Sequence, residues 1–534
     1  MQQVSLNRHK VIIIALIILA AVAIRCYNIN GALFDFNPLR QAVGAAVARN
    51  YTQDPGAAFL LPQADNEGAS PGYFMFELPM LPYVVSLLIR AFGAHNWVFR
   101  LPSIILFALS AIYFFKLCST LVDFRTSAVA LILYCVAPVS ILMSRVIQIE
   151  SFLLLSLFMS IYYLLRWFES EKISHLLVCT VALTVLVLLK ITNLYIFLFI
   201  AVLFFIYKKV RLIPYFVLPT IFVLAVNFWW WGIYCPGIRA AFPTAYTYVG
   251  GEAFFGPKYL LKRFVELSFS REYWALIARQ TFRIIFSPVI SILFLAGVLV
   301  NRDKKLLAVL SAWLFAVFVF IFATPGASSQ DYYKIHFLPA GVIFAAVGCL
   351  YIFDKLAHRW QKKTVMALLW FAVLANVIII VFPIIKYKPV FEYQQVLGKR
   401  VQDLTQKDDL ILTSFGPDAM LLYYCDRKGW SQYLPVKNDN IALLEQRRKE
   451  GAGYFVCGNL DELDSDPGFK EYLIRNYTLI DEGVRQNGEP EKGSLDRFVW
   501  TLSGKIDHPA AKGVRGKLER KSLGYVIFDL REKH

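Results

Sequence analysis

Long apolar runs alternate with short charged links over most of the chain. Apolar runs of about 17–25 residues recur between positions 11 and 385, and this is the length that a helix needs to cross a bilayer. We predict eleven spans, at residues 11–28, 100–120, 126–144, 151–168, 174–190, 193–207, 213–232, 284–300, 306–323, 336–354 and 364–385. The pattern is typical of a polytopic α-helical membrane protein.

After position 385 the pattern changes to mixed, charged and turn-rich sequence. Residues 409–413, 453–457, 478–481 and 525–530 have the pattern of strands, and residues 419–424 and 441–449 that of helices. We therefore divide the chain into a transmembrane domain, residues 1–385, and a soluble α/β domain, residues 386–534.

The basic residues predict the orientation. Much of the net charge of +17 lies in the links after every second span, and cytoplasmic links carry such an excess. These links contain Lys116/Arg125, Glu171/Lys172, Lys208/Lys209/Arg211, Arg302/Lys304/Lys305 and Lys355/Arg359/Lys362/Lys363, of which only the second has no clear basic excess. An odd number of spans then places the C-terminal domain, with the long loops 28–99 and 233–282, outside the cytoplasm. We expect a multi-pass protein of a bacterial inner (cytoplasmic) membrane with a periplasmic C-terminal domain.

Two apolar segments have a second interpretation. The run at 11–23 follows Arg8 and Lys10 and could be a cleaved signal peptide; we favour a retained anchor because the run continues through Cys26 and ten more spans follow. Residues 78–92 are apolar but about 15 residues long and contain prolines, so we expect a helix along the interface rather than across the bilayer.

Composition excludes several classes. The chain is 57% hydrophobic and 17% charged, against about 45–50% and about 25% in soluble domains. No basic groove with interleaved aromatic residues lies outside the links, so nucleic acid is not an expected partner. The eight cysteines form no CxxC pair or zinc-like Cys/His spacing; Cys425 and Cys457 could form a disulfide if the C-terminal domain faces an oxidising compartment.

Charged residues at the outer ends of spans are the candidate chemistry. Asp35, in LFDFNPLRQ, could accept a proton from an acceptor hydroxyl, although an N-cap before Pro38 explains it equally well. Arg40, Arg145 and Lys190 could bind the phosphate of a lipid carrier, although single cations at this depth also contact lipid headgroups.

Acidic residues gather on the same side, at Asp65, Glu67, Glu77 and Glu150. Glu150 begins an apolar span, where a carboxylate is costly unless it is paired or functional, and Arg145 is a candidate partner. Carboxylates could instead hold a divalent cation, but no DxD-like spacing requires one, so we assign no metal ligand.

A third group precedes the span at 336–354. It combines tyrosines, which are common at membrane interfaces, with charged residues, and such mixtures are typical of sugar sites. Its members are Asp331, Tyr332, Tyr333, Lys334 and His336.

Together these motifs, in order along nearly the whole chain, resemble the bacterial members of the dolichyl-phosphate-mannose protein mannosyltransferase family (glycosyltransferase family 39). The sequence is more distantly similar to the aminoarabinose transferase that modifies lipid A. The motifs are DFNPLRQ at 35–41, PxxDxxG at 62–68, FExP at 76–79, FG at 92–93 with WxxRLPS at 97–103, SRxxQxE at 144–150, Lys190, DYY at 331–333 with Pro339, and LYY at 422–424 with RKGW at 427–430.

The resemblance implies the GT-C membrane fold, with interface helices in the outer loops and a polyprenyl-phosphate sugar, such as an undecaprenyl-phosphate sugar, as donor. It implies inverting, single-displacement transfer to lipid A of lipopolysaccharide, a cell-envelope glycan or a protein. We expect Asp35 as general base and assign a catalytic role to Glu150 as well. Donor-phosphate ligands would be Arg40, Arg145 and Lys190, and substrate-binding residues would be Asp65, Glu77, Asp331, Tyr332, Tyr333, Lys334 and His336.

Three positions depart from the family pattern. Relatives of the lipid A branch carry lysine where this chain has Leu78, which weakens an assignment to aminoarabinose transfer. Many relatives have aspartate and histidine at the positions of Glu150 and Gln330.

The expected partners are membrane lipids, the lipid-linked donor and the acceptor, with a divalent metal as an option.

Two other functions remain open. A secondary transporter or lipid flippase is the alternative from another class, although this chain has no internal repeat and carries its ionisable residues at outer span ends. A ligase or polymerase using lipid-diphosphate glycans is the third possibility.

Overall fold

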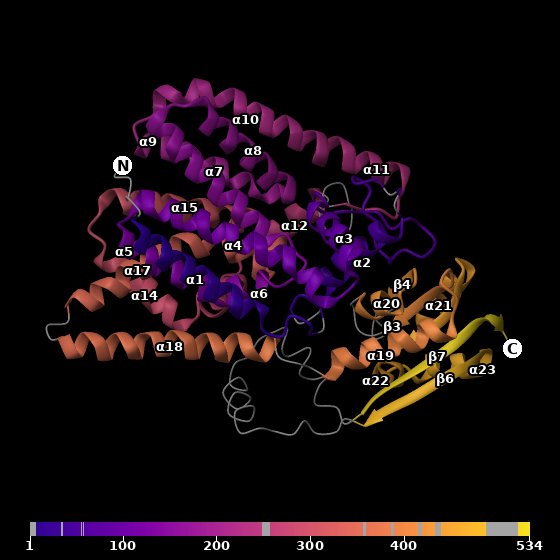
Figure 1. Ribbon diagram of the computed structural model, residues 1–534. Coiled ribbons are helices and arrows are strands. Elements are labelled where there is room, and N and C mark those ends of the chain that lie inside the picture. Colours follow the sequence, from indigo (N-terminus) through magenta and orange to yellow (C-terminus); the bar gives the residue numbers. More distant parts are fainter. Residues whose placement is uncertain are drawn as a thin grey trace.

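A bundle of helices carries a mixed sheet domain at one end in the computed structural model (Figure 1). The structure describes residues 7–31, 33, 36–54, 56, 58–247, 257–355, 359–385, 389–414, 419–432, 439–486 and 522–533. The start of α1 and the C-terminal domain lie at opposite ends of the bundle (Figure 1).

The bundle is built from residues 8–385. In chain order its helices are α1 (Arg8–Cys26), α2 (Pro38–Gln53), α3 (Met80–Phe92), α4 (Asn96–Leu121), α5 (Phe124–Val136), α6 (Pro138–Met143), α7 (Glu150–Ser170), α8 (Ile173–Leu189), η1 (Ile191–Tyr195), α9 (Ile196–Ile206), η2 (Val210–Leu212), α10 (Ile213–Phe228), η3 (Trp229–Tyr234), α11 (Cys235–Ala241), α12 (Pro257–Leu267), α13 (Arg271–Gln280), η4 (Thr281–Ile285), α14 (Pro288–Val300), α15 (Lys304–Ala323), α16 (Pro325–Ser328), η5 (Asp331–Phe337), α17 (Leu338–Lys355) and α18 (Arg359–Ile385). A two-stranded parallel pair, β1 (Phe74–Met75) with β2 (Tyr246–Thr247), joins the two long loops.

Every predicted span contains an apolar helix, but not every helix is long enough to cross a bilayer by itself. Among the described residues, seven helices are long and apolar enough, and the pair Arg271–Ile285 and Pro288–Val300, bent by 104°, is long enough only when the two helices are taken together as one broken span. Phe124–Val136, Ile173–Leu189 and Ile191–Ile206 have only 10–17 residues, so they reach at most about 26 Å. The predicted spans at 174–190 and 193–207 match two of these short helices, whereas the predicted span at 126–144 is divided at Pro138 into α5 and α6.

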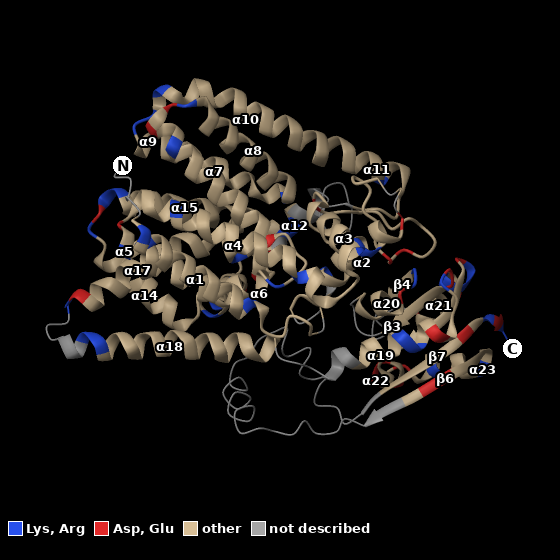
Figure 2. Cartoon of the chain, viewed as in Figure 1, with Lys and Arg blue, Asp and Glu red and all other residues tan. Residues whose placement is uncertain are grey.

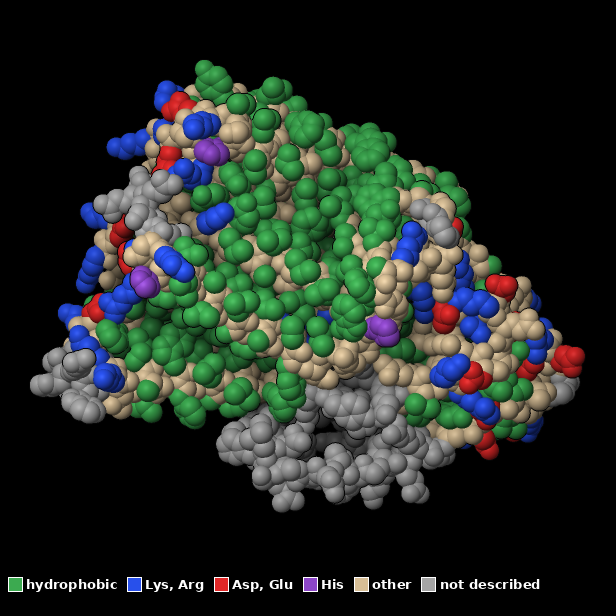
Figure 3. Space-filling model, viewed as in Figure 1, with side chains coloured by type: hydrophobic (Ala, Val, Ile, Leu, Met, Phe, Trp, Pro, Cys, Tyr) green, Lys and Arg blue, Asp and Glu red, His purple; other side chains and the backbone are tan. Residues whose placement is uncertain are grey.

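The outside of the bundle has the character of a lipid-facing surface. Leu218, Leu299 and Phe371, on α10, α14 and α18, are 73%, 79% and 72% exposed. Figure 3 shows hydrophobic side chains over the middle of this face, with charged side chains at its two ends. Lys and Arg gather at the end away from the C-terminal domain, around the α9–α10 link and the starts of α15 and α18 (Figure 2). The chain is a membrane protein.

The predicted interface helix is present as α3. Leu81, Val85 and Ile89, spaced by four residues, form its buried face. They join an apolar cluster with Ala42 and Ala45 of α2, whose small side chains bring the two helices close together. α2 and α3 thus form a unit at the end of the bundle that carries the C-terminal domain (Figure 1).

The C-terminal domain contains a five-stranded sheet with helices packed on it. Its elements are α19 (Pro389–Leu404), β3 (Leu410–Ser414), α20 (Met420–Cys425), β4 (Gly429–Gln432), α21 (Asn440–Lys449), β5 (Ala452–Cys457), α22 (Leu460–Asp464), α23 (Pro467–Asn476), β6 (Tyr477–Gln486) and β7 (Ser522–Lys533). The strand order is β4-β3-β5-β7-β6, with β3 parallel to β4 and β5, and β7 antiparallel to β5 and β6.

The four predicted strands and both predicted helices of this domain are present, whereas α19, β4, α22 and α23 were not predicted. The short β4 has no alternation of apolar and polar residues that would have indicated a strand. The proposed disulfide is wrong, because Cys425 and Cys457 are buried free thiols, the second of which donates to the Asn459 carbonyl. The domain boundary at residue 385 stays a prediction.

α14 and α17 cross at two glycines, and this contact gives a first prediction. A Cβ at Gly297 would overlap the carbonyl of Phe344, and one at Gly348 would overlap the carbonyl of Leu293. Small residues let membrane helices approach this closely. We expect Gly297→Ala to destabilise the protein by about 1–3 kcal/mol through overpacking. The check is the thermal unfolding midpoint in detergent, with Gly237→Ala, whose Cβ would meet nothing within 4 Å, as the control. Equal midpoints would contradict the close helix contact.

Candidate active site

A lysine and a glutamate form a buried ion pair where α7 and α8 meet. Lys190 Nζ lies 3.4 Å from Glu150 Oε1, and the two side chains are only 6% and 3% exposed. Two tyrosines of η5 cover the lysine: its Nζ lies 4.1 Å from the ring centroid of Tyr333 and 4.8 Å from that of Tyr332. A cation this well desolvated next to aromatic faces is strongly held in place.

A second ion pair lies at the start of α2. Arg40 Nη2 is 2.5 Å from Glu77 Oε2, and the guanidinium lies over the rings of Phe74 and Phe76, at 5.5 and 5.8 Å. Burial opposes the charge of Arg40, but Glu77 and, less strongly, Glu150 raise its pKa above the ordinary value. Tyr332 and Tyr333 act on Arg40 in the same direction, so both ion pairs share one neighbourhood. We call Arg40, Glu77, Glu150, Lys190, Tyr332 and Tyr333 the charged cluster.

Local sequence explains how these side chains are presented. Asn37, with φ of +51°, turns the chain into α2, and Pro38 fixes the first helical residue. Glu150 lies in the first turn of α7 and Lys190 directly follows the last turn of α8. The positive end of one helix dipole therefore favours the carboxylate, and the negative end of the other favours the ammonium group.

The cluster has unused hydrogen-bonding capacity. Glu150 Oε2 is buried and, among the described residues, has no hydrogen-bond partner. An unpaired buried carboxylate oxygen is costly unless a ligand donates to it. Lys190 and Arg40 present fixed positive charge for a phosphate, and Arg is suited to binding two oxygens at once. The arrangement fits an anionic ligand that also carries hydroxyl or amino groups.

The remaining η5 residues contact protein groups. Lys334 is fully buried and donates to the carbonyls of Ser328 and Gln330, at 2.5 and 2.7 Å. His336 Nδ1 lies 2.9 Å from the hydroxyl of Tyr195. Asp331 accepts a hydrogen bond from Gln280. Lys334, His336 and Asp331 hold the turn that presents Tyr332 and Tyr333 to Lys190.

Arg145 and Asp65 have described contacts with groups outside the charged cluster. Arg145 is buried and donates to the carbonyls of Arg25 and Tyr27 at the end of α1. Asp65 pairs with Arg49, nine residues after Arg40 on α2 and so about 13 Å farther along the helix. Asp35 lies outside the described residues.

Sequence reasoning missed two arginines that organise the region. Arg25, inside the first apolar run, is fully buried; it donates to Ser144 and Ser140, at 2.5 and 2.9 Å, and lies 3.4 Å from the Phe107 ring centroid. An arginine within a span was itself a signal, since such residues are rare unless they have partners. Arg49 gave no signal, because its partner Asp426 is distant in sequence.

The acidic residues of the region are also candidates for metal ligation. Within the described residues, no group of three or more His, Cys, Asp or Glu side chains is placed to hold a metal ion. The acidic residues of the charged cluster are instead paired with Arg40 and Lys190.

Residues 76–231 match the family model described as dolichyl-phosphate-mannose-protein mannosyltransferase. No curated protein sequence matches the chain. Among solved structures, ArnT from Cupriavidus metallidurans bound to undecaprenyl phosphate is similar with a TM-score of 0.60 at 12% identity, over 88% of this chain and 96% of that one. The archaeal oligosaccharyltransferase AglB from Archaeoglobus fulgidus, in complex with an inhibitory peptide and a dolichol-phosphate, is similar with a TM-score of 0.58 at 12% identity, over 89% and 73%. The matched segment contains Glu77, Glu150 and Lys190. The chain therefore has the GT-C glycosyltransferase fold, and its resemblance to the dolichyl-phosphate-mannose protein mannosyltransferase-like enzymes, drawn first from sequence motifs, is confirmed.

Proposed function

We propose that this protein transfers a sugar from a polyprenyl-phosphate carrier, such as undecaprenyl phosphate, to an acceptor outside the cytoplasm. The observation that carries the proposal is the buried Lys190–Glu150 pair beneath two tyrosines, beside the Arg40–Glu77 pair. Two fixed cations suit a departing phosphate, and aromatic faces with carboxylates suit a sugar. The lipid phosphates bound by ArnT and AglB support the same class of donor.

The reaction is an inverting single displacement. The acceptor nucleophile attacks the anomeric carbon while the bond from that carbon to the phosphate oxygen breaks, and the polyprenyl phosphate leaves with the bonding electrons. Asp35 takes the proton of the nucleophile as general base. Lys190 and Arg40 stabilise the phosphate charge that develops on the leaving group.

Glu77 has one task in this site and Glu150 has two. Each pairs with a cation, and Glu150 Oε2 is left to accept a hydrogen bond from the sugar or the acceptor. Tyr332 and Tyr333 form one wall of the sugar site, held by Asp331, Lys334 and His336. Arg145 stays a predicted phosphate ligand at the end of α1, and Asp65 stays a predicted substrate ligand.

We place the protein in a bacterial inner membrane with the charged cluster and the C-terminal domain on the periplasmic side. The basic links gather at the opposite end of the bundle, which supports this orientation (Figure 2). The acceptor would be lipid A, a cell-envelope glycan or a protein, and the sugar a hexose or a pentose.

The test is transfer by the full chain in proteoliposomes. Undecaprenyl-monophosphate and undecaprenyl-diphosphate sugars are offered as donors, with extracted envelope glycolipids, glycans and proteins as acceptors. We expect acceptor-dependent release of undecaprenyl phosphate from monophosphate donors only. Use of diphosphate donors alone would favour a ligase or polymerase, and movement of the intact donor across the bilayer without transfer would favour a flippase.

A further inference from the structure

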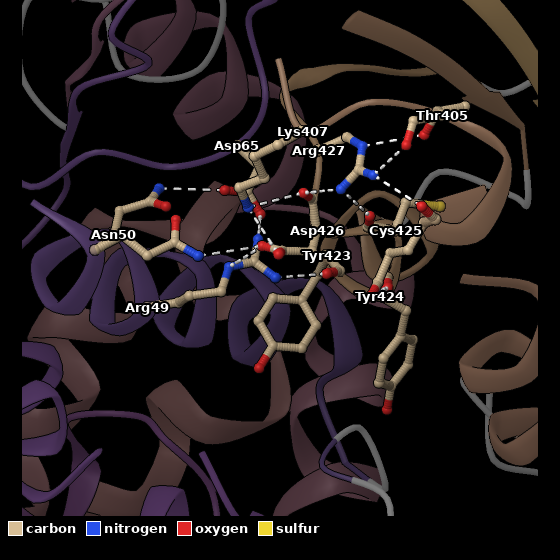
Figure 4. Close-up of polar contacts among 12 residues, drawn as sticks. Arg49, Asn50, Asp65, Thr405, Lys407, Tyr423, Tyr424, Cys425, Asp426 and Arg427 are labelled. Carbon is tan, nitrogen blue, oxygen red and sulfur yellow. Dashed lines mark hydrogen bonds and ion pairs between the residues drawn. The ribbon is translucent and has the colours of Figure 1, made fainter. Parts of the chain in front are cut away.

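Three segments of the chain meet at Arg49 of α2 (Figure 4). Its Nη2 pairs with Asp65 of the first long loop, and its Nε lies 3.0 Å from Asp426 Oδ1 of the C-terminal domain. Its Nη1 donates to the carbonyl of Tyr423 at 2.7 Å, and the guanidinium lies 4.6 Å from the ring centroid of Tyr423. One side chain therefore joins α2, the loop and the C-terminal domain. We call this junction the seam.

Main-chain hydrogen bonds run along the seam. Gly429 of β4 donates to the carbonyl of Asp65 at 3.1 Å and accepts from the amides of Glu67 and Gly68 at 2.9 and 2.8 Å. Asn66 Oδ1 accepts from the amide of Ser431 at 3.1 Å. The loop thus covers the free edge of the sheet like a further strand.

Steric fit adds to these bonds. Gly68 has a φ of +63°, and a Cβ there would overlap the indole ring of Trp430. Glycine is required at position 68 for two reasons. Other residues are strained at this φ, and no side chain fits against the indole ring.

The rest of the seam is not filled by apolar packing. A cavity of about 410 Å³ lies between the three segments, lined by polar and charged residues that include Arg49, Asn50, Asp65, Lys407, Asp426 and Lys428. Met420, Tyr423 and Tyr424 of α20 do reach the apolar cluster of α2 and α3. Beside this apolar contact, ion pairs and main-chain bonds hold the C-terminal domain in place.

The two elements that Arg49 joins to the C-terminal domain both lead to the charged cluster. α2 carries Arg40 two and a half turns before Arg49. The loop leads to Glu77 and is stiffened on the way, since Ala64 donates to the Gly72 carbonyl at 2.9 Å and Phe74 to the Pro62 carbonyl at 2.8 Å. A shift at the seam would move Arg40 and Glu77 together, relative to Lys190 and Glu150.

We propose that Arg49 is a positioning residue through which the C-terminal domain sets the place of the Arg40–Glu77 pair beside the Lys190–Glu150 pair. The proposal rests on the proposed function, since it assigns Arg49 to the same transfer reaction. A displacement of about 1 Å in a positioned group can cost about 100-fold in rate. The C-terminal domain therefore acts on catalysis without contacting the reacting atoms.

The experiment compares Arg49→Ala with wild type and with Arg400→Ala in the full chain. Arg400 pairs with Asp481 inside the C-terminal domain at 2.6 Å, so its removal deletes an ion pair of that domain away from the seam. Amide exchange of residues 65–68 and 429–431 reports docking directly. The kcat of transfer and the KM values for donor and acceptor report the effect on the charged cluster.

For Arg49→Ala we expect exchange at the seam to rise at least about tenfold, with β5 as protected as before. We expect kcat to fall about 10- to 100-fold, and Arg49→Lys to restore part of it. Arg400→Ala should change neither the amide exchange at the seam nor kcat. Lost docking with unchanged kcat, or unchanged exchange at the seam, would overturn the proposal. An inactive wild-type protein would instead refute the proposed function, because the exchange measurement does not depend on activity.

Gly68→Ala tests the same proposal without removing a charge. It should loosen the seam and lower kcat as Arg49→Ala does, whereas Gly468→Ala should not. Gly468 lies in the C-terminal domain, where a Cβ would come no closer than 3.7 Å to Asp466. Full activity of a Gly68→Ala protein whose seam is open would refute the positioning role.

The seam should also respond to acid. Burial alone would raise the pKa of Asp426, but Arg49 and Lys407 outweigh it and hold the pKa below the ordinary value of about 4. Asp65 shares Arg49, and Gln53 also donates to Asp426 at 3.4 Å. A carboxylate with a lowered pKa stabilises the folded form above its ordinary pKa, and this contribution is lost as the pH falls through the folded value. Exchange at residues 65–68 should therefore rise below about pH 4 in wild type, and less steeply in Asp426→Asn; identical acid profiles would contradict the role of Asp426.

Discussion

Asp35→Asn is expected to lower the kcat of sugar transfer about 1,000-fold while the protein still folds and inserts into membranes. A general base contributes about 100- to 10,000-fold to such a rate, and an amide of the same shape cannot take a proton. The expectation comes from the motif at 35–41 and from the placement of Arg40, five residues on, beside Glu77. The measurement is kcat at saturating donor and acceptor in proteoliposomes.

The matched control is Asp54→Asn, at the other end of α2. Asp54 is exposed, and its carboxylate accepts a hydrogen bond from the amide of Gly56 at 3.0 Å. Loss of the Asp54 carboxylate should leave kcat within about twofold of the wild-type value, because most surface substitutions have small effects. If Asp35→Asn kept wild-type kcat, Asp35 would not be the base.

Lys190→Ala is expected to reduce kcat/KM for the donor about 100-fold or more, with the acceptor KM within twofold of wild type. Removing one partner of a buried pair costs about 3–5 kcal/mol, because the other charge is left alone. Here the loss combines a missing phosphate contact with a stranded Glu150 carboxylate, 3.4 Å from the former ammonium group. Varying each substrate in turn separates donor from acceptor effects.

The double variant Lys190→Ala/Glu150→Gln separates these two causes. It removes the stranded charge, so a folding defect of the single variant should be relieved, while donor use should remain weak. Lys305→Ala is the control, since Lys305 also lies over a tyrosine ring, 4.0 Å from the centroid of Tyr207, but at the start of α15. A double variant with full donor efficiency would remove Lys190 as a phosphate ligand.

The fold was predictable from the sequence where the physical constraint is local. Bilayer thickness fixes the length of apolar runs, so each predicted span contains a helix. Strand patterns identified β3, β5, β6 and β7. The bend before α14 was not predictable, because Ser287, with φ of +77°, turns the chain there for reasons that lie in its packing.

The candidate site was predictable to a similar extent. Charges at span ends pointed to Arg40, Glu77, Glu150 and Lys190, because uncompensated charge at that depth is costly. Their pairing was not predictable, since the nearest charge to Glu150 in sequence is Arg145, whereas its partner in space is Lys190. Arg49 escaped notice because Asp426 comes from a different domain.

The edge of β4 has a consequence for the order of assembly. Asn66 and Ser431, which hydrogen-bond across the seam, are 365 residues apart, so the first long loop is synthesised long before the strand that it covers. During synthesis, the newly made sheet meets a partner that is already in place on the membrane. Severed from the helices, the same sheet would present a bare strand, and bare strands template aggregation.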